Sequence, residues 1–244
     1  MKWIFIDYIN YLKYKLWLWK VSWNGCGKGG VIIMFHHVRD DNPATISESC
    51  KTTTSEFIEF VNFVVKNRIP VSIDTLLNSV KNVNLNQMVV VSFDDVPDNF
   101  YNVAYPILKQ YNIPFTLYIA TGFMDTEGYL TTEQVKRLAT DPLCTIGAHT
   151  ISHPMLKHHK VNLKEEICNC GKVLEGIIGK PVVHFAYPFG TPTAINRRVI
   201  NFTKKMSIYK SAVITIPGYV NQYSLKDIFA LPRIHSKLYM KKYK

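Results

Sequence analysis

The sequence predicts an α/β domain in which about seven parallel strands alternate with helices and can close into a barrel. Short apolar runs alternate with segments of helical periodicity from about residue 31 to residue 235. The run at 88–93 is rich in valine and carries no charge, which is typical of a strand buried on both faces of a parallel sheet. Six or seven such units are enough to form a barrel.

Length and composition indicate one full-sized domain. Of the 244 residues, 47% are hydrophobic, which provides enough side chains to fill a core. The five cysteines are odd in number and follow no spacing of a disulfide framework or a zinc finger. A reducing compartment is therefore the simpler expectation.

The first half of the domain begins with a short apolar strand at 31–35, which ends at His36 and His37. Ser55 is suited to cap the next helix, because apolar residues recur at helical spacing over 57–65. The remaining elements expected here are a strand at 71–73, a helix at 74–80, the strand at 88–93, a helix at 98–111 and a strand at 115–120.

The second half continues the same alternation. Thr131 or Thr132 can cap a helix through Leu138. Gly179 and Pro181 close a longer helix that begins at 161 or 162. The other elements expected here are strands at 144–148, 182–187, 211–216 and 229–234 and a helix at 193–202.

Both ends of the chain are basic, and the net charge is +11. Such ends suit an anionic surface such as a bilayer or an acidic glycan, or serve only to keep the protein soluble. No basic recognition helix or aromatic RNA-binding signature accompanies the charge, so nucleic acid is not an expected partner.

The aromatic segment at 1–20 is expected neither to span a membrane nor to be a signal peptide. Lys2, Asp7, Lys13 and Lys15 break it into apolar runs far shorter than the ~20 residues of a spanning helix, and no small-residue cleavage site follows. Two interpretations stay open, a helix at a membrane interface and a helix packed on the domain itself. The absence of a signal peptide and the reduced cysteines favour the cytoplasmic side of a membrane.

Two adjacent carboxylates, Asp94 and Asp95, follow the apolar strand at 88–93. Carboxylates at the end of a buried strand are costly unless they bind a metal, a proton or a partner charge. Adjacent strand residues point to opposite faces, so the two can share a site only if the chain leaves strand geometry there, as Pro97 allows. The alternative is that they cap the following helix or lie in its first turn.

His149 and His153 are the other candidate metal-binding residues. Their spacing of i and i+4 places both imidazoles on one side of a helical turn, although such pairs also occur by chance. Asp95 and His149 both follow predicted parallel strands and are therefore expected on the same rim of the sheet. Two imidazoles and one carboxylate are typical of catalytic zinc sites, and Asp94 would then be free to act as a base.

Three short segments match, in order, the motifs of one enzyme family. Residues 92–95 look like the start of T-F-D-D-G, with Ser92 at the threonine position, residues 149–153 match H-[ST]-x-x-H, and residues 185–190 look like R-x-P-[FY]-G. From residue 31 to about residue 235 the chain resembles the polysaccharide deacetylases of carbohydrate esterase family four, including bacterial exopolysaccharide-type members. The resemblance implies a distorted (β/α) barrel and metal-dependent removal of acetyl groups from glycans.

The resemblance also implies a role for each matching residue. Asp94 would be the general base, and Asp95, His149 and His153 would bind a divalent metal, expected to be zinc, with cobalt, nickel or iron as alternatives. Phe189 would offer its backbone N–H to the oxyanion. The other expected site residues are His36, Tyr187 and Pro188 beside the substrate and His235 as the acid that protonates the leaving amine.

Two positions depart from the family pattern. Val96 replaces the glycine after the aspartates, and Ala186 replaces the arginine of the third motif, which orients the base. Arg233 can substitute for that arginine, because Arg233 and His235 lie two apart in the predicted last strand and face the same way. If that face is the interior, Arg233 pairs with Asp94. The alternative is that Arg233 and His235 lie at an edge and reach solvent.

The expected function is hydrolysis of the acetyl group from N-acetylated sugars of a polysaccharide or a lipid-linked oligosaccharide. The alternatives are a non-catalytic glycan-binding barrel and a relative that hydrolyses a small cyclic amide. The expected organisation is a basic amphipathic segment and glycine-rich linker at 1–30, the catalytic domain at 31–236 and a basic tail at 237–244.

Overall fold

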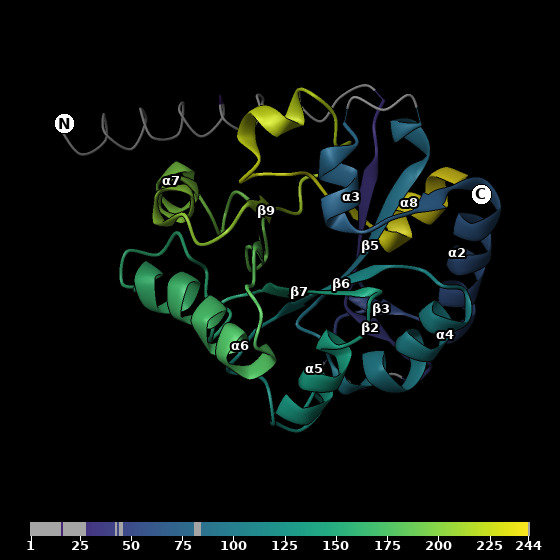
Figure 1. The fold of residues 1–244 in the computed structure, drawn as a ribbon, viewed down its shortest axis with the longest axis horizontal. Coiled ribbons are helices and arrows are strands. Elements are labelled where there is room, and N and C mark those ends of the chain that lie inside the picture. The colour runs from purple at the N-terminus through teal and green to yellow at the C-terminus, as the bar shows by residue number, and fades with distance from the viewer. Residues whose placement is uncertain (1–15, 17–27, 42, 44–45, 81–83, 244) are drawn as a thin grey trace.

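The computed structural model describes residues 16, 28–41, 43, 46–80 and 84–243 and confirms the predicted fold (Figure 1). All strand pairs of its main sheet are parallel, and the sheet curls into a half-barrel. In order across the sheet, the strands are β10 (Ile234–His235), β1 (Val31–Phe35), β5 (Met88–Asp94), β6 (Phe115–Ile119), β7 (Cys144–Ala148), β8 (His184–Ala186) and β9 (Ser211–Val213).

Helices cover the outside of this sheet. Five of them follow one another around it: α2 (Thr54–Asn67), α4 (Tyr105–Gln110), α5 (Thr132–Ala139), α6 (Cys170–Ile178) and α7 (Arg197–Met206). Wider π-helical turns precede two of them, η2 (Phe100–Ala104) before α4 and η3 (Lys164–Asn169) before α6. The smaller elements are β2 (His37–Val38), β3 (Lys51–Thr52), β4 (Ile69–Pro70), α3 (Ile73–Asn78), η1 (Leu85–Gln87), η4 (Ser224–Asp227) and α8 (Ser236–Tyr243).

The segment 228–235 joins the two edges of the sheet. On one side, the backbone N–H groups of Ala212 and Ile214 in and after β9 donate to the carbonyls of Ile228 and Leu231. On the other side, β10 pairs with β1. The predicted strand at 229–234 therefore has the expected place in the barrel, although only its end is regular enough to form β10.

Alternation along the strands separates two hydrophobic clusters. Ile33 and Val91 belong to the main core, which lies between the sheet and the helices. Ile32 and Val90 belong to a smaller cluster inside the curl of the sheet. Because side chains two and four residues apart in a strand share a face, Asp94 lies on the inner face with Val90.

Helix caps set several boundaries that the sequence analysis placed differently. α2 is capped by Thr53 rather than Ser55, because Thr53 and Glu56 form a reciprocal capping box. Ser72 caps α3, so the predicted strand at 71–73 is wrong and the short strand β4 lies just before it. Asn196 caps α7, which therefore begins later than the helix predicted at 193–202.

The predicted terminal segments have different outcomes. The expectations for residues 1–20 lie outside the described residues except at Leu16, which is helical and exposed. At the end of the predicted linker, Gly30 already pairs with Val220. The predicted basic tail is helical as far as Tyr243, and the buried ring of Tyr239 packs against Phe60. Within the described part of the chain, no helix has both the length and the apolarity needed to cross a membrane.

Gly147 in β7 makes room for Tyr118 inside the barrel, so we expect Gly147→Ala to destabilise the protein. An added Cβ would lie 2.6 Å from the fully buried Tyr118 ring and 3.1 Å from the backbone oxygen of His184. Overpacking of this kind costs about 1–3 kcal/mol. Urea unfolding should show this loss. Gly176→Ala in α6, where nothing lies within 4 Å of the added carbon, should be neutral or stabilising.

Candidate active site

Asp94 and Asp95 share one site because the chain leaves strand geometry after Asp94. Asp95 and Val96 both adopt left-handed conformations, with φ angles of 60° and 51°. The N–H of Val96 donates to the carbonyl of Asp94 at 2.6 Å, which closes a tight turn. The condition set by the sequence analysis is therefore met, and Val96 takes the conformation for which a glycine is better suited.

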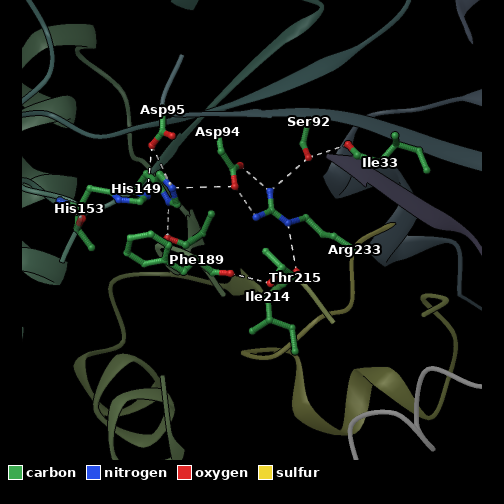
Figure 2. A network of polar contacts seen from close by, with 12 residues as sticks. Ile33, Ser92, Asp94, Asp95, His149, His153, Phe189, Ile214, Thr215 and Arg233 are labelled. Atoms are coloured by element: carbon green, nitrogen blue, oxygen red, sulfur yellow. Dashed lines mark hydrogen bonds and ion pairs between the residues drawn. The ribbon is translucent and has the colours of Figure 1, made fainter. Parts of the chain in front are cut away.

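Arg233 forms a two-pronged ion pair with Asp94, as the sequence predicted for an inward-facing arginine. Its Nη1 and Nη2 lie 2.6 Å from Oδ1 and Oδ2 of Asp94. Arg233 is fully buried and Asp94 is 2% exposed. Figure 2 shows Asp94 between Arg233 on one side and His149 on the other. Ala186, which stands at the arginine position of the third motif, is buried and carries no charge. Among the described residues, Arg233 is therefore the arginine that pairs with Asp94.

The ion pair decides the charge of Asp94. Burial is the largest single influence and by itself raises the pKa of this carboxyl, but the charge and hydrogen bonds of Arg233, together with the nearby His149 and His36, outweigh burial and hold the pKa well below its usual range. Asp94 is therefore ionised at neutral pH. Its Oδ2 lies 4.0 Å from Nε2 of His149, so the carboxylate adjoins the histidine pair as well.

Asp95, His149 and His153 converge at the carboxyl ends of β5 and β7. Their potential ligand atoms all lie within 4.8 Å of one another, and among the described residues they form the cluster suited to a metal ion. Oδ1 of Asp95 lies 3.5 Å from Nε2 of His149 and 3.4 Å from Nε2 of His153. The histidines do not lie on a helix, as their spacing suggested. A turn with left-handed Thr150 and His153 brings them together instead.

The donor set fits a divalent metal. A tetrahedral zinc ion with ligands at about 2.0–2.2 Å requires ligand atoms about 3.4 Å apart, which is close to both distances from Asp95. Oδ1 of Asp95 is buried and has no hydrogen-bond partner within the described structure. Nδ1 of His149 lies 2.8 Å from the carbonyl of Ala186, so this bond leaves Nε2 free as a ligand. Burial lowers the pKa values of His149 and His153, which favours the neutral rings that a metal needs.

His36 and His235 stack near Asp94, with ring centroids 6.3 Å apart. Burial lowers the pKa of His36 to about 3, and its Nδ1 is buried without a hydrogen-bond partner in the described structure. Burial, followed by the charge of Lys237, also lowers the pKa of His235. Nδ1 of His235 accepts a hydrogen bond from the backbone N–H of Lys237 at 3.3 Å, so Nε2 carries the proton in the neutral ring.

The third motif forms a tight turn beside the histidines. Phe189 is left-handed, with a φ angle of 59°, and the N–H of Gly190 donates to the carbonyl of Pro188 at 2.7 Å. The Phe189 ring is 45% exposed and its centroid lies 4.6 Å from that of His153. Tyr187 differs from its prediction as a substrate residue, because its side chain is fully buried in the core against Phe185.

Phe123 and Tyr129 border the site but were missed by the sequence analysis. The Phe123 ring lies 6.0 Å from His153 and 4.8 Å from Tyr129, measured between centroids. Both belong to the loop that follows β6, on the rim where β5 and β7 also end. Their position directly after a central parallel strand is the feature of the sequence that could have identified them as site residues. With Phe189 they give the site a partly exposed aromatic border.

Solved structures share this architecture. The Streptococcus pyogenes deacetylase PplD in complex with acetate is similar over 90% of this chain and 100% of PplD, with a TM-score of 0.75 and 22% sequence identity. IcaB from Ammonifex degensii is similar over 86% of this chain and 92% of IcaB, with a TM-score of 0.67 and 22% identity. At such identities the likeness establishes the fold.

Sequence relatives and a family profile agree with the fold. Bacillus subtilis (strain 168) YxkH is 26% identical over 147 residues, 60% of this chain and 50% of YxkH. The Staphylococcus aureus poly-beta-1,6-N-acetyl-D-glucosamine N-deacetylase is 29% identical over 114 residues, 41% of this chain and 39% of that enzyme. The chain thus spans half or less of the length of these relatives. The profile described as polysaccharide deacetylase matches residues 81–210, more than half of the 244 residues, and this chain therefore belongs to the polysaccharide deacetylase family.

Proposed function

We propose that this chain is a metal-dependent deacetylase that hydrolyses acetyl groups on N-acetylated sugars of a polysaccharide. The observation that carries the proposal is the convergence of Asp95, His149 and His153 beside the ionised pair of Asp94 and Arg233. A divalent metal held by the three ligands would supply Lewis acidity toward a water molecule and the acetyl carbonyl. Zinc suits this donor set, with cobalt, nickel or iron as alternatives.

Asp94 is the proposed base. Its carboxylate is ionised and fixed by Arg233, so it can accept a proton from the attacking water without first losing one. The left-handed turn at Phe189 supports a role for the backbone N–H of this residue in binding the oxyanion, because that N–H takes part in none of the hydrogen bonds found within the described structure.

His235 is the proposed acid for the leaving amine. Its lowered pKa leaves the ring neutral in the free protein, and a neutral imidazole is too weak an acid for this role. His235 must therefore take up a second proton during the reaction before it can protonate the amine. The proton that Asp94 takes from water is the available source, and the charge of Asp94 favours protonation of His235. His36, stacked on His235, is proposed to orient this ring.

An acetylated exopolysaccharide is the proposed substrate class. The Staphylococcus aureus relative is named for a polymer of N-acetylglucosamine, which supports an N-acetyl substrate. Phe123, Tyr129 and Phe189 offer flat apolar surfaces beside the site on which a sugar ring could pack.

Removal of the metal tests the proposal. We expect the protein to release acetate from oligomers of β-1,6-linked N-acetylglucosamine and to lose at least about 100-fold of this activity after treatment with a chelator. Added zinc should restore it. Acetate release that is insensitive to chelation would contradict metal dependence. A zinc-loaded protein that binds the oligomer but releases no acetate would instead favour the non-catalytic glycan-binding barrel.

A further inference from the structure

We infer that Glu166 is a positioning residue that holds the two histidine ligands in place through the turn between them. The inference rests on the proposed function, because it concerns the metal site formed by Asp95, His149 and His153. Glu166 belongs to η3 and lies thirteen positions after His153, outside the three motifs.

The carboxylate of Glu166 binds the middle of the turn at both of its oxygens. Oε2 accepts hydrogen bonds from the backbone N–H groups of Ile151 and Ser152, each at 2.9 Å. Oε1 accepts from the hydroxyl of Ser152 at 2.6 Å. Hydrogen bonds from three donors to one carboxylate fix its orientation, and bonds to an ionised acceptor are about twice as strong as neutral ones.

The opposite side of the same turn is bound by the loop after β6. The N–H groups of Thr121 and Gly122 donate to the carbonyls of Thr150 and Ile151 at 3.0 and 2.9 Å. This side consists of backbone, and a Cβ on Gly122 would lie 2.6 Å from the Ile151 oxygen. The turn is therefore clamped between a backbone loop and one side chain, Glu166.

The turn needs such a clamp because its backbone is strained. Thr150, which is β-branched, and His153 have φ angles of 68° and 55°. Conformations of this kind cost of order 1–3 kcal/mol each and persist only where the surroundings hold them. The N–H of His153 also donates to Oγ1 of Thr150 at 3.1 Å, but this bond lies within the turn and cannot hold it against the domain.

The π-helical turn η3 places Glu166 at the clamp. Leu163 and Ile167 on either side of it are buried in the main core and anchor this stretch. A wider helical turn changes the direction in which the intervening side chains point, and such turns are frequent at functional sites. Glu165, the next residue toward the N-terminus, is exposed and accepts a hydrogen bond only from Asn169 on the helix surface among the side chains described.

Loss of the clamp should weaken metal binding. Without Glu166 the turn can relax toward less strained conformations. The two imidazoles are then no longer held in the positions that metal binding requires. Mutation of residues that support metal ligands from behind typically lowers the metal affinity by about 10–100-fold. A residue that served only to stabilise the fold would lower the melting temperature and leave the affinity of the folded protein unchanged.

Zinc titration of chelator-treated protein tests the inference, with calorimetric Kd and the melting temperature of the metal-free protein as readouts. We expect Glu166→Ala to raise the Kd for zinc by about 10–100-fold and Glu165→Ala to leave it unchanged. Glu166→Gln should recover most of the affinity, because its amide oxygen can accept from both N–H groups and its NH₂ can donate to Ser152.

The outcomes separate this inference from the proposed function. A Glu166→Ala protein with a lowered melting temperature and wild-type Kd would overturn the inference and leave the proposed function standing. A Glu166→Gln protein as weak as Glu166→Ala would overturn the hydrogen-bonding role assigned here. Wild-type protein that binds no zinc would overturn both the metal-dependent function and the inference that rests on it.

Discussion

Asp94→Asn is expected to lower the rate of acetate release by about 10²–10⁴-fold while zinc binding persists. Asparagine keeps the shape of the side chain but cannot accept a proton at neutral pH. The three proposed metal ligands remain, because Asp94 is not one of them. The measurements are initial rates of acetate release and the zinc content of the purified variant.

A matched control is Asp98→Asn, which removes a carboxylate from the same stretch of chain but not from the cluster of ligand atoms or the ion pair. This variant should keep wild-type activity and zinc content. An Asp94→Asn protein that retains activity would rule out Asp94 as the base. One that loses zinc together with activity would show that Asp94 supports the metal rather than the proton transfer.

Arg233→Met is expected to cost about 3–5 kcal/mol in the free energy of unfolding at neutral pH. Arg233 is fully buried, and both ends of its guanidinium bind Asp94. Its removal leaves a buried carboxylate with no cationic partner in the interior, which is far more costly than the loss of the pair as a whole. Urea unfolding, monitored by fluorescence and circular dichroism, measures the change.

The double variant Asp94→Asn with Arg233→Met isolates the charge effect. Because it removes both charges, it should be more stable than Arg233→Met alone, and equal or lower stability would contradict a dominant role of the buried charge. Activity should fall in both proteins. Arg233→Lys keeps the charge but not the two-pronged geometry and should lie between wild type and Arg233→Met.

The same pair predicts how stability changes with pH. In the wild type, burial raises the pKa of Asp94, but Arg233 together with His149 and His36 lowers it by more. The folded value therefore lies below the unfolded one, and the stabilisation is complete above the unfolded value. In Arg233→Met, burial is opposed by the smaller effects of His149 and His36 and is expected to raise the folded pKa, so the variant becomes more stable as the pH falls through that value. The difference between the two proteins should therefore shrink at acidic pH.

The parallel α/β fold and the main site residues were accessible from sequence because they depend on periodicity, on spacing and on the three motifs that carry the family resemblance. The apolar run before Asp94 identified a buried strand, and parity along the last strand put Arg233 and His235 on one face, which the structure shows to be the inner one for Arg233. The pairing of Asp94 with Arg233 was predicted on a condition: the family resemblance implied an arginine beside the base, and strand parity made Arg233 a substitute only if its face was the interior.

Other features depend on contacts that a single sequence does not display. Thr53 rather than Ser55 caps α2 because Glu56 completes the capping box, and both serine and threonine suit that position. His149 and His153 meet through a strained turn rather than a helical one, and that turn is held by residues from two other segments. Tyr187 shares a motif with Phe189, yet the strand before it directs its ring into the core.

Arg233 reaches Asp94 from the segment that joins the two edges of the sheet, long after β5 and β7 along the polypeptide. During translation both aspartates and both ligand histidines therefore emerge before the guanidinium does, by a delay on the order of 10 s at ordinary elongation rates. If the strand that carries Asp94 packs before Arg233 arrives, burial without this cation favours the protonated form of the carboxyl. Completion of the Asp94–Arg233 pair therefore waits for the last strand to dock, and a chain cut short before residue 233 would lack the cation that keeps the proposed base ionised.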